Sequence, residues 1–139
     1  MNERQIMTEK ILVRINGSER DGTYRRIGST DYVHYREYAE EENARKAGEE
    51  PDQVLMKLSG SCLEIVRSGK IRSRMIFEEG KCIPAEYETP YGKIEMVVAG
   101  HRVHISRGES RILVDMQYRL LRAGEEISQN AVSIEILPV

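Results

Sequence analysis

The sequence predicts an all-β protein, a meander of about eight to ten antiparallel strands closed into a barrel. From about residue 54 onward, apolar residues alternate with polar ones at a period of two, as in strands with one buried face. Glycines at positions 60, 69, 80, 92, 100, 108 and 124 separate these stretches, mostly at gaps of 8 to 12 residues. No stretch between them has helical spacing. A sheet with this many strands has two edges that need partners, which favours closure into a barrel and leaves a tight sandwich as the alternative.

The first 38 residues predict two clear strands. Ile11, Val13 and Ile15 alternate and end at Asn16-Gly17, a strong turn signal. The charged run 18–22 favours a turn, followed by a short strand at 24–27. Residues 32–39 alternate again, with aromatic side chains on both faces. The polar, acidic stretch from Glu40 to Asp52 lacks an apolar face, which favours a solvated loop over one or two helical turns near 41–47.

The second half predicts a series of hairpins. The strand at 111–122 is the longest expected, and a loop of three to five residues at 122–126 leads to the last strand. The predicted inward sets are Ile71, Ser73, Met75 and Phe77; Ile83, Ala85 and Tyr87; Ile94, Met96 and Val98; Ile112, Val114, Met116, Tyr118 and Leu120; and Val132, Ile134 and Ile136.

Length and composition predict one domain, residues 1–139, with one core. The 23 acidic and 21 basic residues leave a net charge of -2, so neither nucleic acid nor a membrane is expected as a partner. The first ten residues contain no apolar run of the kind a secretory signal needs, which predicts a soluble, cytoplasmic protein with Cys62 and Cys82 as reduced thiols.

Several segments of the chain match the pattern of a known family. They are Val13-Arg14-Ile15, Leu63 to Gly69, Met75-Ile76-Phe77 with Gly80, Tyr87 to Gly92, Met116 to Leu120, and Ser128-Gln129-Asn130 with the alternating tail. In these segments the chain resembles the DUF1934 (YwiB-like) family of uncharacterised bacterial β-barrel proteins. The likeness covers most of the chain from residue 54 onward, and its most specific part is the turn Thr89-Pro90-Tyr91-Gly92. The resemblance implies a closed, calycin-like (lipocalin-like) barrel and supplies no reaction.

Polar residues on inward positions are the candidates for ligand binding. Arg67 continues the face of Leu63 and Ile65, which places its guanidinium near one barrel end. There it closes the barrel by pairing with a carboxylate or a tyrosine ring, or it anchors an acidic ligand. The turn at 89–92 has a structural interpretation, in which Tyr91 caps the barrel, beside the binding one. The candidate ligand-binding residues are Arg67, Ser73, Tyr87, Tyr91, Tyr118 and Asn130.

No catalytic motif, metal site or cofactor is predicted. His101 and His104 are three residues apart, which on a strand places them on opposite faces. An enzyme that uses an inward arginine with Glu64 or Glu86 is the least supported hypothesis. The first hypothesis is a barrel that binds a small molecule in its lumen, an anionic one if Arg67 is the anchor. Side chains can also fill the interior of an eight-stranded barrel, so a dry, packed core stands beside this hypothesis as an equal alternative. The alternative is an interaction or structural module that contacts a partner, such as a second copy in a homodimer, through its outer strands or the acidic loop at 40–50.

Overall fold

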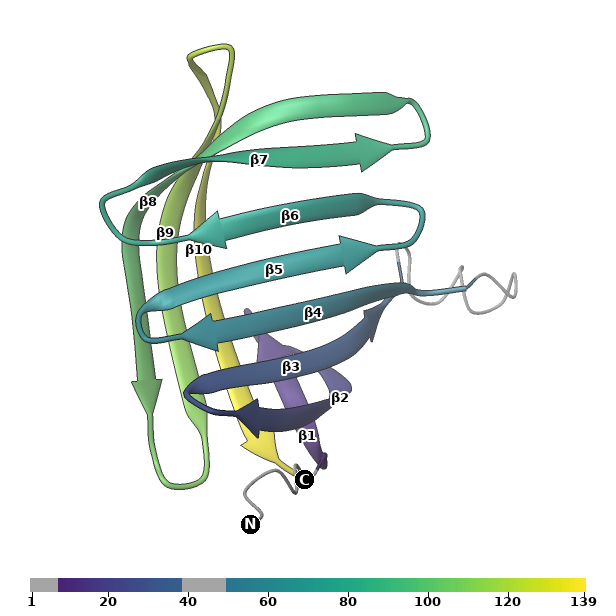
Figure 1. Ribbon diagram of the computed structural model, residues 1–139, viewed down its shortest axis with the longest axis vertical. Helices are drawn as coiled ribbons and strands as arrows, with labels where there is room; N and C mark the ends of the chain where they lie inside the picture. The colour runs from purple at the N-terminus through teal and green to yellow at the C-terminus, as the bar shows by residue number, and fades with distance from the viewer. Residues whose placement is uncertain (1–7, 39–49) are drawn as a thin grey trace.

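The computed structural model describes residues 8–38 and 50–139, and all regular structure in these ranges is β-strand (Figure 1). This agrees with the predicted all-β class and with the upper end of the predicted strand number. The ten strands are β1 (Glu9–Ile15), β2 (Ser18–Ile27), β3 (Thr30–Glu37), β4 (Asp52–Ser59), β5 (Cys62–Ser68), β6 (Arg72–Phe77), β7 (Cys82–Thr89), β8 (Gly92–Arg107), β9 (Ile112–Arg122) and β10 (Glu125–Pro138).

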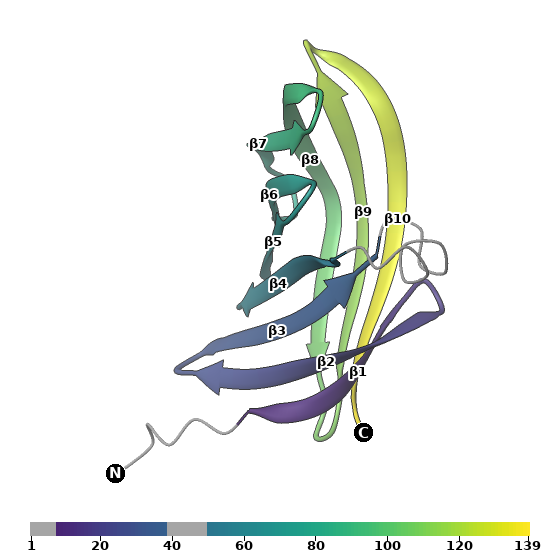
Figure 2. The same ribbon diagram turned by 90° about the vertical axis from the view of Figure 1, so that its right-hand side faces the viewer.

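The strands form one closed antiparallel barrel. Each strand pairs with its neighbours in sequence, and β1 closes the ring by pairing with β10, from Ile11 opposite Pro138 to Ile15 opposite Ile134. Two views show the long strands β8, β9 and β10 curving along one side of the barrel, while β4 to β7 run across the other (Figures 1 and 2). This closure is the predicted architecture, and it is consistent with a calycin-like fold.

The core fills the middle of the barrel with side chains from both sides. The predicted alternation holds along β6, β7, β9 and β10, where every buried residue lies on the face assigned to it. In β8 it holds at Met96 and Val98 but fails next to them, where Ala99 and Gly100 are both buried. Phe77 from β6 and Tyr118 from β9 meet edge to face across the interior, with ring centroids 4.7 Å apart. The largest fully buried side chains are Phe77, Met56, Leu58, Leu63, Met116 and Ile134.

The predicted turn at residues 18–22 is wrong, because β2 runs without a break from Ser18 to Ile27. The segment pairs with β1 on one side and β3 on the other. The alternation is hard to recognise in the sequence because Arg20 and Gly22 take two of the inward positions, opposite Val13 and Ile11. Backbone pairing on both sides therefore overrides a weak local strand preference.

Gly100 does not end a strand, contrary to its predicted role as a turn glycine. It lies inside the 16-residue strand β8, which makes β8 rather than the predicted 111–122 segment the longest strand. The register between β8 and β9 shifts between Gly100 and Arg102, as at a β-bulge. A Cβ at Gly100 would lie 2.3 Å from the carbonyl oxygen of Glu78, so the bend needs a residue without a side chain.

The hairpin turns are short. Asn16 and Gly17 have positive φ angles of 48° and 85°, which confirms the turn after the first strand. Ala123 and Gly124 form a similar two-residue turn, with φ angles of 52° and 80°, so the predicted loop of three to five residues is too long. Most of the acidic segment, residues 39–49, lies outside the described residues. Within the described ranges, no helix is long and apolar enough to span a membrane.

Candidate functional site

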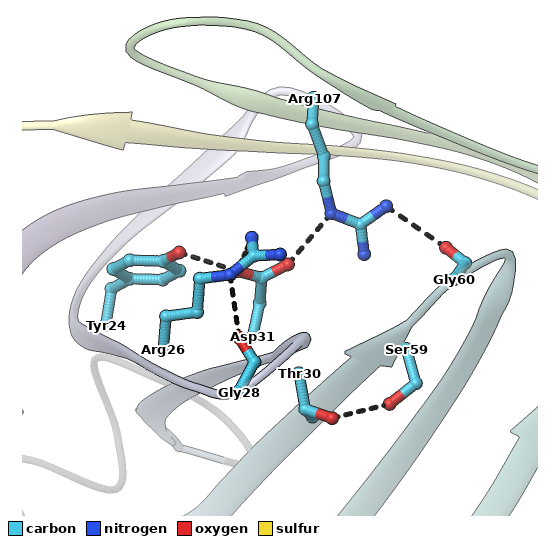
Figure 3. A network of polar contacts seen from close by, with 8 residues as sticks. All are labelled: Tyr24, Arg26, Gly28, Thr30, Asp31, Ser59, Gly60 and Arg107. Atoms are coloured by element: carbon cyan, nitrogen blue, oxygen red, sulfur yellow. Dashed lines mark hydrogen bonds and ion pairs between the residues drawn. The ribbon is translucent and has the colours of Figure 1, made fainter. Parts of the chain in front are cut away.

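One end of the barrel is held by a buried carboxylate. Asp31, at the start of β3, is fully buried and accepts hydrogen bonds from the Tyr24 hydroxyl at 2.6 Å, Arg26 Nη1 at 3.1 Å and Arg107 Nε at 2.9 Å (Figure 3). Burial raises the pKa of the Tyr24 hydroxyl, and the hydrogen bond to Asp31 raises it further, so this hydroxyl remains a donor. We call Tyr24, Arg26, Asp31 and Arg107 the clasp.

The clasp joins strands that are not neighbours in the ring. Arg107 lies at the end of β8, yet it bonds Asp31 on β3 and donates from Nη1 to the Gly60 carbonyl in the β4–β5 turn at 3.1 Å (Figure 3). Beside it, the hydroxyls of Thr30 and Ser59 lie 2.9 Å apart. A charged group that leaves water needs such partners, and here all of them come from the barrel itself. The clasp therefore closes this end.

The opposite end presents a row of polar side chains on the inward face of β2 to β7. We call this row the polar rim; it consists of Arg20, Glu37, Asp52, Arg67, Ser73 and Tyr87. Glu37 and Asp52 are direct cross-strand partners, and two like charges in this position repel each other. Each has its own arginine: Arg20 Nη2 lies 2.9 Å from Glu37, and Arg67 Nε lies 2.7 Å from Asp52.

Asp52 holds the side chain of Arg67 in place, and the turn between β5 and β6 holds Asp52 in turn. Asp52 is 6% exposed, and its second oxygen accepts the backbone N–H of Lys70 at 2.8 Å. A Cβ at Gly69 would lie 1.9 Å from this oxygen, so the turn needs glycine for the carboxylate to fit. Only Nε of Arg67 is bonded; within the described ranges no group accepts a hydrogen bond from its two terminal nitrogens. The guanidinium is oriented but keeps its outer donors.

Ser73 and Tyr87 extend this arrangement along the rim. Ser73 is the cross-strand partner of Arg67, and Tyr87 is the cross-strand partner of Ser73. Direct partners have Cβ atoms about 5 Å apart, so the three side chains form a continuous half-buried row. The structure therefore brings together three of the six predicted binding residues.

Tyr118 and Asn130 form a separate pair on the long strands. They are register partners on β9 and β10, and both face inward. The Asn130 amide donates to the Ser128 hydroxyl at 2.9 Å. Burial raises the pKa of Tyr118, so its hydroxyl stays protonated well above neutral pH. No contact joins this pair to Arg67, Ser73 or Tyr87 in the part of the chain that the structure describes.

Tyr91 lies apart from the other candidates. It is at the tip of the β7–β8 turn, where the Thr89 hydroxyl accepts its backbone N–H at 3.1 Å. Its side chain is 99% exposed. The expectation that Tyr91 caps the barrel end is therefore wrong, and the turn at 89–92 serves the local geometry of the hairpin.

The two buried aspartates of the clasp and the rim were missed by sequence reasoning. A signal for both exists: Asp31 precedes Val33 and Tyr35 on one face, and Asp52 precedes Val54 in the same way. An acidic residue that continues an apolar alternation must be paired when the strand folds. The rim residue Arg20 lies in the segment that was predicted to be a turn. Glu37 lies at the end of β3, beyond the last buried residue of that strand.

The geometry does not support the hypothesis of an enzyme that uses Glu64 or Glu86. The Glu64 carboxylate bonds Arg74 Nε on the outer face, and Glu86 also faces outward, so neither acts beside an inward arginine as the enzyme hypothesis requires. Cys62 and Cys82 are free thiols, and burial raises the pKa of Cys62. In the described ranges, no group of three or more His, Cys, Asp or Glu side chains is arranged to hold a metal ion.

Two hollows mark the surface. One, of about 800 Å³, lies along β1 to β3 and is lined by Arg20, Tyr35 and Glu37 among other residues. The second, of about 680 Å³, lies over β6 to β9. None of the six predicted binding residues lines either of these hollows, but Arg20 and Glu37 of the polar rim line the first.

Fold and site together define a closed, ten-stranded antiparallel barrel with one clasped end and one polar rim. The model of the family described as a domain of unknown function, DUF1934, matches residues 8–134. The chain belongs to this family, as the resemblance in the sequence implied.

A solved structure supports the same fold. The chain is similar to the ywiB protein from Bacillus subtilis, with a TM-score of 0.72 and 15% sequence identity, over 95% of this chain and 89% of that one. At this identity the likeness shows the fold alone. No curated protein matches the chain.

Proposed function

We propose that this protein binds a small anionic molecule at the polar rim, with Arg67 as the anchor. The observation that carries the proposal is the state of this guanidinium: Asp52 holds Nε, and the terminal nitrogens have no acceptor within the described ranges. A fork of N–H groups held in this way matches a carboxylate or phosphate oxygen pair. Ser73 and Tyr87 add hydroxyl groups along the same row.

The packing of the core supports a ligand at the rim rather than deep in the lumen. Phe77, Met56 and Met116 are almost fully buried in the middle of the barrel, and Tyr118 packs on Phe77. Barrel diameter grows with strand number, and in this ten-stranded barrel large apolar side chains fill the middle. The clasp at the far end leaves the rim as the end with free polar groups.

The first prediction tests this anchor. Arg67→Lys keeps the positive charge but removes the planar fork, so we expect it to weaken ligand binding about tenfold. Native mass spectrometry of the purified protein and a thermal-shift panel of anionic metabolites measure the loss. Arg72→Lys is the matched control, because Arg72 is exposed on the opposite face of the adjacent strand. Equal loss in both variants, or the absence of any bound anion, contradicts the proposal.

In the alternative function, an interaction module, the outer surface of the barrel contacts a partner protein or a second copy of the chain. The acidic loop proposed as its contact surface lies almost entirely in residues 39–49, outside the described residues. A homodimer is checked by light scattering coupled to size-exclusion chromatography. The outer face of β6 to β9 offers a more specific surface for this function.

A further inference from the structure

The ladder between β6 and β7 is the weakest seam of the barrel. It contains three residue pairs, Arg72–Glu88, Ser73–Tyr87 and Arg74–Glu86. Beyond them, residues 75–77 of β6 and 82–85 of β7 do not pair with each other, and the two strands part toward the loop that joins them (Figure 1). Each strand keeps its ladder on the other side, so the facing edges carry backbone groups without a ladder partner.

The loop between these strands keeps the seam open. Gly80 N–H donates to the Gly100 carbonyl at 2.8 Å, and Gly100 N–H donates to the Lys81 carbonyl at 2.9 Å. Glu79 accepts the backbone N–H of Val103 at 3.1 Å. The loop is thus tied to the bend of β8, which holds the ends of β6 and β7 apart.

A hollow of about 680 Å³, with both apolar and charged side chains in its walls, lies over this seam on the outer face. Its walls come from both strands, and Val97 and Leu121 continue it onto β8 and β9. Ile76 lies on one side of the seam and Pro84 on the other. Proline in a sheet is confined to edges and bulges because it has no N–H to donate, and Pro84 follows this rule.

Two carboxylates at the hollow form no ion pair within the described ranges. Glu86 and Glu95 are direct cross-strand partners on the outer face of β7 and β8, a position in which like charges repel. Arg74 also lines the hollow and is the cross-strand partner of Glu86 on β6, but its Nε bonds Glu64. One cation thus faces three carboxylates, which leaves the hollow with net negative charge. A cation placed over the hollow would relieve this repulsion.

We propose that this hollow docks an extended segment of a partner protein in which aliphatic side chains alternate with lysine or arginine. The aliphatic side chains cover Ile76, Val97 and Leu121, the cations meet Glu86 and Glu95, and the segment's backbone pairs with the open edge of β6. The open edge favours a peptide over a small organic cation, which has no backbone to offer. The inference concerns the outer face and is independent of ligand binding at the rim.

The second prediction uses a defined probe, a capped seven-residue peptide of alternating valine and lysine. Titrated into ¹⁵N-labelled full-length protein, it is expected to shift amide signals of residues 74–77, 85–86 and 95–97. Glu86→Gln with Glu95→Gln is expected to weaken this binding at least about tenfold, since two charge-assisted contacts are lost. The matched control is Glu9→Gln with Glu109→Gln, two exposed carboxylates outside the hollow with the same change in net charge.

Four outcomes overturn the proposal. They are the absence of shifts at millimolar peptide, equal binding of a valine–glutamate peptide, equal weakening in the two double variants, and unchanged binding of a valine–lysine peptide that is N-methylated on alternate residues. Shifts with 1,4-diaminobutane that equal those with the peptide would assign the hollow to small cations instead. Loss of rim-ligand binding in Arg67→Lys leaves this result unaffected, so the two proposals fail separately.

Discussion

Asp31 is a single residue on which one end of the barrel depends. Its carboxylate is fully buried, and two arginines and one tyrosine from other positions bond it. In the third prediction, Asp31→Asn keeps the shape but removes the charge, which leaves Arg26 and Arg107 without their counter-charge. Leaving a fully buried charge without its partner costs about 3–5 kcal/mol, but Arg26 and Arg107 are 48% and 28% exposed, so we expect a smaller loss of unfolding free energy, about 1–3 kcal/mol.

The matched control for Asp31 is a carboxylate of the same type on the surface. Asp115 is 3.1 Å from Arg102, but both side chains are at least half exposed. Exposed pairs contribute roughly 0–1 kcal/mol, so Asp115→Asn should change stability little. Urea unfolding followed by circular dichroism compares the two variants. Similar small losses in both would show that the clasp does not hold the barrel.

Ionisation of Tyr35 makes the stability of the fold depend on pH. Burial, and next the charge of Glu37, raise its pKa from 10.0 to about 12. The unfolded chain therefore loses this proton at a lower pH than the folded one. Its stabilising contribution is complete below pH 10 and is lost as the pH rises to about 12.

The fourth prediction follows from this titration. Two pH units correspond to roughly 2–3 kcal/mol, so the unfolding free energy should fall by about this amount between pH 10 and 12 through Tyr35 alone. Tyr35→Phe has no ionisable phenol and should show a correspondingly shallower decline. Urea titrations at a series of pH values measure the difference. Parallel curves for the two proteins would contradict the assignment.

At the residue scale, the sequence predicted which side chains point inward better than it predicted which side chains they bond. The inward direction of Arg67, Ser73 and Tyr87 follows from alternation, and the structure places them in one row. Asp52, which orients Arg67, lies 15 residues away across a hairpin, and only the register brings the two together. No local pattern encodes such a pairing.

At the scale of elements, the bend in β8 depends on one glycine. In the fifth prediction, Gly100→Ala puts a methyl group against the Glu78 carbonyl, a backbone atom that cannot rotate away. We expect a loss of about 1–3 kcal/mol, typical of overpacking. Gly108→Ala is the control, because its nearest neighbour would be 3.5 Å away. Equal unfolding midpoints in urea for these two variants would refute the role of Gly100.

Elements were predicted well where alternation was regular and poorly where it was interrupted. The strands at β1, β3, β7 and β9 follow from apolar residues at every second position. β2 was divided because charged residues and a glycine occupy it, and its strand form depends on neighbours on both sides. β8 was divided at Gly100, because a glycine at a bulge and a glycine at a turn look alike in a sequence.

At the scale of the whole molecule, closure was predictable because ten amphipathic strands without a covering helix leave few alternatives. The clasp and the polar rim were not predictable, because they depend on which residues become cross-strand neighbours when the sheet forms. The fold is shared with the ywiB protein at 15% identity, so two quite different sequences form the same barrel.

The pairing of β1 with β10 also sets how late in synthesis the barrel can close. Val13 meets Ile136, and these residues are separated by nearly the whole chain. During synthesis β10 leaves the ribosome after the strands that precede it, so one edge of β1 lacks its partner until β10 has emerged. Bringing such distant segments together carries a large loop-closure entropy and is slow. The nascent chain is therefore most prone to pairing with other chains just before the ring is sealed.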